Sequence, residues 1–335
     1  MTACKVSPAV DRLAEVAPAP PPLIALARPA DGSQITFGPF NVPAGKNVQL
    51  CRTLQLDNDH EVAVNRFELK MLANSHHFIL FRAQPKPDGT YYQYPDQVFD
   101  CQQTLNFEEW AFVFDINRAG GDDIHLGEGQ AVVFEPHARL LVQAHFLNEA
   151  KEDVKGYDVL NLYNTDRSKV AHEIHGKFTV DTRIDIPPKS IYSTSRRCSF
   201  SRTVHITAMT GHFHKQGTKF EVMYRNMIDD SDISQAYCSG ESCSDPDGAA
   251  SNWGHPLFKY FDPPLLVNGT IDAQGQGLYF TCSYDNETGN EIRFGGLADT
   301  QEHCNLFFQY YFDRETPLDG TPAGQLQCAE GSGGW

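Results

Sequence analysis

The chain has 335 residues, and its 41% hydrophobic and 21% charged content is typical of an ordinary folded protein. Its formal net charge of -16 at pH 7 argues against nucleic acid and anionic membrane surfaces as partners, because both are themselves negative. No apolar run approaches the roughly 20 residues of a membrane-spanning helix. We expect about two domains in a chain that is soluble or held to a membrane only by a lipid anchor.

The first segment, residues 1–30, is predicted to be a flexible tail with a Pro-rich stretch. Within it, Thr2-Ala3-Cys4 resembles the end of a bacterial lipoprotein signal, in which the cysteine is lipidated. The alternative is an exposed free Cys4 in a disordered tail. At the other end, residues 331–335 resemble an engineered linker to an affinity tag, so we exclude them from the fold prediction.

Cysteine usage points to an oxidising compartment. The chain has nine cysteines, a high number for a cytosolic enzyme of this size, and they lack the C-x-x-C pairs of a structural zinc site. We therefore expect disulfides in an exported protein, either periplasmic or extracellular. Nine is an odd number, and Cys4 is the candidate for the unpaired residue.

Beyond the tail, short segments rich in Val, Ile, Phe, Tyr and Thr alternate with Gly, Pro, Asn and Asp, a pattern that predicts β-strands. Few windows have the 3.6-residue period of a helix, so the predicted fold class is all-β. In chain order the predicted strands are 47–56, 61–72, 77–82, 131–135, 139–147, 177–186, 203–214, 218–225, 277–284 and 305–312.

A domain boundary is predicted near residues 178–190, because two prolines in Ile186-Pro187-Pro188 would interrupt a central strand. It divides the chain into residues 31–180 and 181–330. Sheets bury their apolar faces by packing on one another, so each domain is predicted to be an antiparallel β-sandwich.

The segment Thr210-Gly211-His212-Phe213-His214 places two histidines at i and i+2 of a predicted strand. Alternation puts both imidazoles on one face, where they can share a metal ion, and turns Phe213 toward the opposite face. This spacing predicts a metal site.

His76 and His77 are adjacent, so both can bind one ion only at a strand end or a local irregularity. His145 and His303 are weaker candidates when each is taken alone. The candidate ligands are all imidazoles, a set that suits copper or zinc rather than calcium or magnesium. Ligand type does not separate copper from zinc.

The other histidines are predicted to be structural or surface residues. His172 and His175 form an H-x-x-H near the domain junction. His205 precedes His212 by seven residues and therefore faces the opposite side of a regular strand. The remaining members of this group are His60, His125, His137 and His255.

Four segments in this order resemble the family of peptidylglycine α-hydroxylating monooxygenase and dopamine β-monooxygenase, the ascorbate-dependent type II copper monooxygenases. They are Ser75-His76-His77-Phe78, Gln143-Ala144-His145-Phe146, Gly211-His212-Phe213-His214, and Gly295-Gly296 through Glu302-His303-Cys304-Asn305-Leu306. The similarity spans most of residues 35–328.

The resemblance implies two consecutive jelly-roll-like sandwiches, each with one copper ion, separated by a solvent-filled cleft. It implies that His76, His77 and His145 hold an electron-transfer copper, and that His212, His214 and His303 hold the catalytic copper. The implied chemistry hydroxylates a C–H bond with dioxygen and electrons from ascorbate or another one-electron reductant.

The same comparison implies a set of disulfides, in which Cys304 would fix the backbone beside His303. The implied pairs are Cys51–Cys101, Cys198–Cys328 and Cys282–Cys304, with Cys238–Cys243 as a local addition.

Two features depart from the family pattern. Where this chain has His303, the family has a methionine. A thioether ligand favours Cu(I), whereas a site of three imidazoles stabilises Cu(II) relatively more. Where the peptide-amidating enzyme grips a carboxylate with an arginine and a tyrosine, this chain has Thr210 and Phe307. Asn305 is retained as a candidate substrate contact, but one amide cannot replace a bidentate charged clamp, so a glycine-extended peptide is not the expected substrate.

Two functions stay open. The first is a copper monooxygenase, a monomer that hydroxylates an unidentified small organic substrate. The second is a copper-binding protein of the same fold that sequesters or delivers copper or relays electrons without hydroxylating a substrate.

Overall fold

The computed structural model describes residues 24–86, 88–95, 97–101, 109–116, 120–240, 242–243, 258–313 and 328–329, the last pair by backbone only. These residues form strands and one short 3-10 turn, η1 (Arg167–Lys169), so the all-β prediction is confirmed. No helix among them is long and apolar enough to cross a membrane. Cys4 and residues 331–335 lie outside the described residues.

The first half of the chain forms two sheets. Their strands are β1 (Gly32–Val42), β2 (Asn47–Gln55), β3 (Val62–Met71), β4 (Ser75–Ala83), β5 (Phe99–Asp100), β6 (Trp110–Ile116), β7 (Gly121–His125), β8 (Gln130–Phe134), β9 (Arg139–Leu147), β10 (Val154–Thr165) and β11 (His172–Glu173). The first outer sheet has the order β1-β10-β3-β8-β11, with β7 paired to β3, and the first inner sheet has the order β5-β2-β9-β4-β6. A hydrophobic core lies between them, in which Phe67 stacks on Phe114 at 4.8 Å.

The second half has the same plan. Its strands are β12 (His175–Val180), β13 (Asp185–Ile186), β14 (Ser190–Phe200), β15 (Val204–His212), β16 (Gly217–Asn226), β17 (Asp232–Gly240), β18 (Lys259–Val267), β19 (Gln276–Asn286), β20 (Ile292–Phe294), β21 (Gln301–Glu302), β22 (Asn305–Tyr311) and β23 (Cys328–Ala329). The second inner sheet is β12-β22-β15-β18, the second outer sheet is β17-β16-β19-β14-β23, and β13-β20-β21 form a small third sheet. A second core fills the space between the inner and outer sheets.

The predicted single strand 177–186 is wrong, because β12 ends at Val180 and β13 begins at Asp185. The buried Asp181 carboxylate accepts a hydrogen bond from the backbone N–H of Arg183 and turns the chain between them. β12 lies before residue 180, yet it pairs with β22 of the second half.

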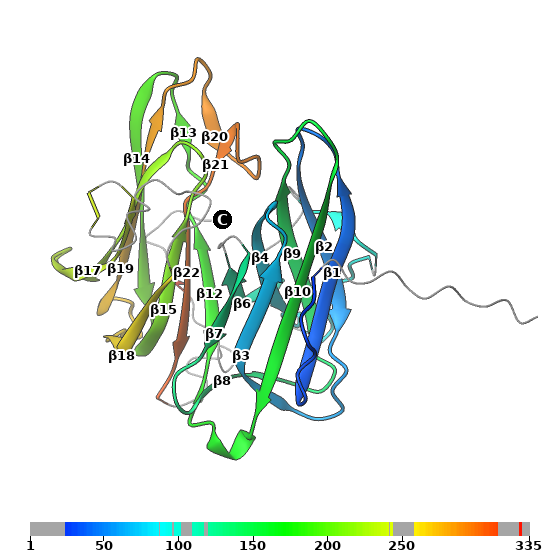
Figure 1. Ribbon diagram of the computed structural model, residues 1–335. Coiled ribbons are helices and arrows are strands. Elements are labelled where there is room, and N and C mark those ends of the chain that lie inside the picture. Colours follow the sequence, from blue (N-terminus) through cyan, green and yellow to red (C-terminus); the bar gives the residue numbers. More distant parts are fainter. Residues whose placement is uncertain are drawn as a thin grey trace, which may run out of the picture.

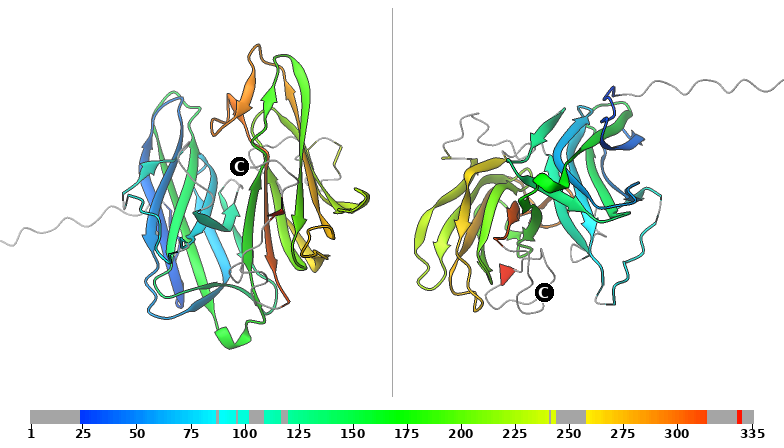
Figure 2. Two further views of the ribbon diagram at one scale, coloured as in Figure 1. Left: turned by 180° about the vertical axis from the view of Figure 1, so that it is seen from behind. Right: turned by 90° about the horizontal axis from the view of Figure 1, so that it is seen from below.

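The two inner sheets face each other across a buried aromatic contact, and the halves stand side by side in Figures 1 and 2. Phe307 of β22 lies 5.1 Å from Phe112 of β6 and 4.6 Å from Phe178 of β12, measured between ring centroids. A Cβ on Gly176 would lie 2.2 Å from the Phe112 carbonyl oxygen, so only glycine allows β12 to approach β6 this closely. This contact fixes how the halves meet.

Three predicted disulfides are present, Cys51–Cys101, Cys238–Cys243 and Cys282–Cys304. Cys198 is also disulfide-bonded, but the side chain of its predicted partner Cys328 lies outside the described residues. Disulfides at this density indicate an oxidising compartment.

Candidate metal centre

The fold gathers the six predicted ligands into two triads. His76, His77 and His145 form the first triad, and His212, His214 and His303 form the second. Within each triad, one donor atom from each residue lies within 4.8 Å of the other two, a separation from which three imidazoles can bind one ion.

The first triad depends on an irregularity in β4. His77 lies opposite His145 in the β4–β9 pair, and the register shifts between Ser75 and His77. This β-bulge removes the strict alternation that would turn adjacent side chains to opposite faces. The ring of His76 consequently lies 5.4 Å from that of His77 and 5.3 Å from that of His145.

The second triad lies where β15 ends and β22 begins. His212 is the last residue of β15 and pairs with Asn305, while His214 lies two residues further on. Their rings are 5.3 Å apart, and the ring of His303 lies 4.2 Å from that of His214. Phe213 points the other way into the second core, as the i, i+2 spacing predicts.

Burial keeps these imidazoles neutral. Desolvation lowers the pKa of His145 to about 3 and that of His214 to about 4. It lowers the pKa of His77, His212 and His303 far below the ordinary value, and neighbouring histidines add to the effect at these three residues. A neutral imidazole offers the lone pair that a metal ion requires.

Several buried ring nitrogens have no hydrogen-bond partner among the described residues. They are both nitrogens of His77, both nitrogens of His145, Nδ1 of His212 and Nδ1 of His303. Buried polar atoms without partners are costly, and a bound metal ion would satisfy one nitrogen of each ring. The two triads therefore fit metal ions, and an all-imidazole donor set suits copper or zinc.

Glu302 holds the backbone of the second triad in place. Its buried carboxylate accepts hydrogen bonds from the backbone N–H of His214 at 2.7 Å, of Gln216 at 2.7 Å and of His303 at 3.3 Å. Burial raises the pKa of Glu302 to about 8, while these N–H donors act in the opposite direction. One side chain thus ties the segment after β15 to the segment before β22.

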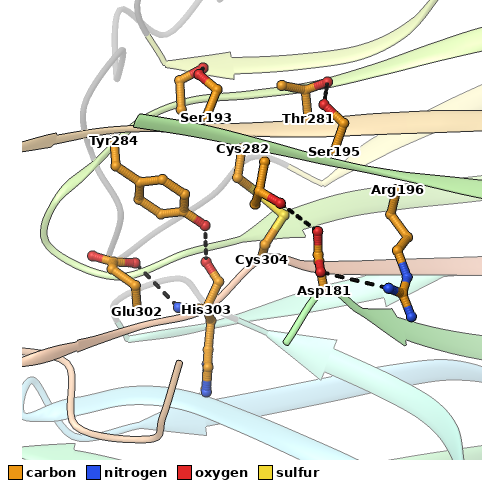
Figure 3. The surroundings of a disulfide bond; sticks show 12 residues. Asp181, Ser193, Ser195, Arg196, Thr281, Cys282, Tyr284, Glu302, His303 and Cys304 are labelled. Carbon is orange, nitrogen blue, oxygen red and sulfur yellow. Dashed lines mark hydrogen bonds and ion pairs between the residues drawn. A yellow bond between two sulfur atoms is a disulfide. The ribbon is translucent and has the colours of Figure 1, made fainter. Parts of the chain in front are cut away.

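Further contacts orient the ligands themselves, as Figure 3 shows around His303. Tyr284 donates a hydrogen bond to the His303 carbonyl oxygen at 2.7 Å, and the next residue is tied to β19 by the Cys282–Cys304 disulfide. His214 donates from Nδ1 to the Gln301 carbonyl oxygen at 3.0 Å. That bond leaves Nε2 of His214 to bind a metal ion.

The predicted solvent-filled cleft between the two sites is wrong for this structure. The His212 ring lies 5.7 Å from the His77 ring and 6.1 Å from the His76 ring, so the triads are in direct contact. The physical reason is the packing of the two inner sheets on each other, in which Phe307 of β22 contacts Phe112 of β6.

A cavity of about 40 Å³ lies beside both triads. Its polar wall includes Asn305, and no arginine or lysine lines it in the described part of the chain. The remaining lining residues are Gln49, His77, Ile79, Phe81, Asp115, Gln143, Phe178, His212, His303 and Phe307. Thr210 and Phe307, at the positions of the family's carboxylate clamp, are both buried.

One histidine differs from its predicted orientation. His205 stacks on Tyr311 at 4.7 Å, and His172 of β11 stacks on the same tyrosine at 4.1 Å, so His205 faces the first half, as His212 does. The prediction of the opposite face is wrong because β15 has a β-bulge between Ile206 and Ala208. His205 is paired with Asp313 and takes no part in either triad.

The other predicted non-ligands also lie outside the triads. His175 is buried against Tyr310, whereas His125 and His137 are paired with aspartates on the surface. His60 is exposed, and His255 lies outside the described residues.

Sequence reasoning missed Glu302 and Gln301 as residues that position the second triad. The only signal was that both precede His303 directly, and a carboxylate or amide next to a ligand is common without such a role. Their importance depends on the folding of residues 214–216 against them.

Comparisons with known proteins identify no relative. No protein-family model matches the sequence, and no curated protein is significantly similar to it. Among solved structures, a peptide-N(4)-(N-acetyl-β-D-glucosaminyl)asparagine amidase is 10% identical with a TM-score of 0.37, covering 88% of this chain and all of its own. The STIV MCP is 9% identical with a TM-score of 0.34, covering 84% and 97%. The major capsid protein P2 from bacteriophage PM2 is 9% identical with a TM-score of 0.32, covering 83% and 97%. Similarity this weak assigns no function.

Proposed function

We propose that the protein is an exported two-copper oxidoreductase that uses dioxygen and a one-electron reductant such as ascorbate to hydroxylate a small organic substrate. The observation that carries the proposal is the pair of histidine triads, buried except for the half-buried His303, each able to hold one ion. In this proposal the paired sheets are two consecutive jelly-roll-like β-sandwich domains, residues 31–180 and 181–330.

The reaction that we propose converts a C–H bond, dioxygen, two electrons and two protons into a C–OH group and water, with the electrons supplied by the reductant. Bound copper would supply the activation of dioxygen and the one-electron steps. His76, His77 and His145 would hold the electron-transfer ion, and the second triad would hold the catalytic ion. In the second triad, Glu302 and the Gln301 carbonyl would keep the ligands aligned.

The side chains that line the cavity do not form a charged clamp for a carboxylate substrate. Asp115 contributes a carboxylate, and the cavity has no arginine or lysine within the described ranges. Phe307 and Phe178 present aromatic rings instead of a charged clamp. A glycine-extended peptide, whose free carboxylate needs such a clamp, is therefore not the substrate that we propose.

Copper content and oxygen consumption test this function. After copper reconstitution, elemental analysis should give two coppers per chain, and ascorbate-driven oxygen consumption should require an added organic substrate. A single tightly held metal, or zinc alone in the protein as isolated, would contradict the two-copper assignment.

One observation favours the alternative, a copper-binding or electron-relay protein without hydroxylase activity. The cavity beside the triads is only about 40 Å³, whereas sites for organic ligands typically span roughly 300–1,000 Å³. Reduction of dioxygen only to peroxide across a broad substrate panel would favour the relay function.

The cellular setting forms part of the proposal. Disulfides indicate an oxidising compartment, which we take to be the periplasm or the extracellular space. A lipid anchor at Cys4 and a monomeric state complete the proposed description.

A further inference from the structure

The distances between the triads match the distances within them. The His212 ring lies 5.3 Å from His214 and 5.7 Å from His303, its own partners, and it lies 5.7 Å from His77 of the other triad. It is also 6.1 Å from His76. His212 is therefore as much a neighbour of the first triad as a member of the second.

Packing of the two halves fixes this approach. The first and second inner sheets share a buried cluster that includes Phe112 and Phe307, and Gln309 of β22 donates a buried hydrogen bond to the Val113 carbonyl oxygen of β6. Close packing makes such an interface resist small displacements. The triads are held together by elements of regular structure and not by surface loops.

The shared cavity selects a small occupant. It is lined by His77 of the first triad and by His212 and His303 of the second, so its contents touch both. A volume of about 40 Å³ accommodates water molecules or a small anion, since roughly 10–15 Å³ on this measure already holds one water.

Electrostatics favours an anion in that position. Two divalent ions in adjacent buried sites repel each other strongly, because the effective dielectric constant there is lower than in water. Imidazole binds a metal ion as a neutral ligand, so the six rings offer no compensating charge, and Asp115 is the one carboxylate among the described residues that line the cavity. An anion bound between the ions offsets the repulsion.

From these observations we propose that the six imidazoles form one dinuclear copper centre, in which the two ions share a small bridging ligand such as hydroxide. This inference rests on the proposed two-copper function, but it replaces two independent ions with a magnetically coupled pair.

Electron paramagnetic resonance of the wild-type full chain tests the inference. Protein loaded with two Cu(II) per chain, as measured by elemental analysis, should give an integrated signal far below two spins per chain, or a half-field transition. Protein loaded with one Cu(II) per chain should give an ordinary signal that accounts for its copper. Azide, used as the probe for the bridging position, should perturb both ions at a stoichiometry of one azide per chain.

A substitution that separates β12 from β6 provides a variant in which the two triads lie further apart. In Gly176→Ala the new Cβ meets the Phe112 carbonyl oxygen at 2.2 Å, so β12 must move away from β6 without any change to a ligand. We expect this variant to keep two coppers and to recover spin intensity toward two per chain. The control Gly277→Ala introduces a comparable clash with the Cys198 carbonyl oxygen at 2.5 Å within the second half, and it should keep the coupled spectrum.

The copper content and the spin intensity together distinguish failure of the dinuclear centre from failure of the proposed function. Two coppers per chain with two full, non-interacting spins would overturn the dinuclear centre and leave the proposed function standing. Fewer than two coppers per chain would overturn both. The wild-type measurement decides the matter even if Gly176→Ala does not fold.

Discussion

Asp158 is a buried carboxyl group whose replacement by asparagine should reshape the pH dependence of stability. It lies in β10 between Phe37 and Met71 of the neighbouring strands and is fully buried. Ser75 is beside it and lowers its pKa slightly, but neither carboxyl oxygen makes a hydrogen bond of normal geometry within the described residues. Burial raises the pKa of Asp158 from 3.8 to about 8.

The sign of the effect follows from proton binding. Well below pH 3.8 the carboxyl group is neutral in both the folded and the unfolded chain. As the pH rises from 4 to 8 the unfolded chain ionises while the folded chain keeps the proton, so the free energy of unfolding falls. One pKa unit corresponds to about 1.4 kcal/mol, which gives a loss of about 3 kcal/mol between pH 5 and pH 7 from this group.

Asp158→Asn is neutral at every pH and escapes this loss. The stability of the variant relative to wild type should therefore rise by up to about 3 kcal/mol between pH 5 and pH 7. Urea denaturation of the metal-free, disulfide-intact protein at pH 5, 6 and 7 measures it, because other titrations cancel in the difference.

An exposed aspartate in the same half provides the control. Asn41 and the backbone N–H of Ala44 donate hydrogen bonds to Asp153 and lower its pKa, so its carboxyl group is ionised in both the folded and the unfolded chain from pH 5 to pH 7, and Asp153→Asn should show no pH trend in that range. A stability difference for Asp158→Asn that does not change with pH would refute the reasoning.

Three further predictions concern the ligands and their support. Glu302→Gln loses one acceptor oxygen and leaves a buried N–H unsatisfied, so the free energy of unfolding measured by urea denaturation should fall by about 1–3 kcal/mol. Copper binding should weaken at the second triad alone, and equal weakening of both triads in a competition titration would contradict this. His303→Met should raise the reduction potential of the second copper and increase oxygen reactivity, because a thioether favours Cu(I); an unchanged potential would show that His303 is not a ligand. Desolvation lowers the pKa of His145 to about 3 in the folded chain. As the pH falls below 6.5, this imidazole takes up a proton in the unfolded chain but not in the folded chain, so the free energy of unfolding of the metal-free protein falls. His145→Asn should remove about 2 kcal/mol of the loss between pH 7 and pH 5, and an identical loss in both proteins would disprove it.

The sequence by itself determined the local structure and the ligand types. Strand-forming composition along 139–147 predicted β9 to the residue, and the i, i+2 spacing of His212 and His214 placed both rings on one side with Phe213 in the core. These features depend on the backbone period of a strand, which neighbouring residues set.

Only the tertiary structure showed how side chains are oriented where the strands are irregular. The bulge after Ser75 brings His76 and His77 to one site. The bulge after Ile206 turns His205 to the same face as His212, whereas a regular strand would place the two on opposite faces. A bulge depends on how a strand fits its partners, so strand alternation alone predicts neither.

The approach of the two triads also came only from tertiary structure. The sequence predicted two sets of three histidines. The 5.7 Å between the rings of His77 and His212 depends on the packing of Phe307 against Phe112, and on Gly176, which has no side chain to prevent the close approach of β6. Within a regular strand, local sequence fixes which face of the sheet carries a side chain. The meeting of two faces depends on the sum of many contacts between residues far apart in the chain, and that sum also sets the burial that keeps the histidines neutral.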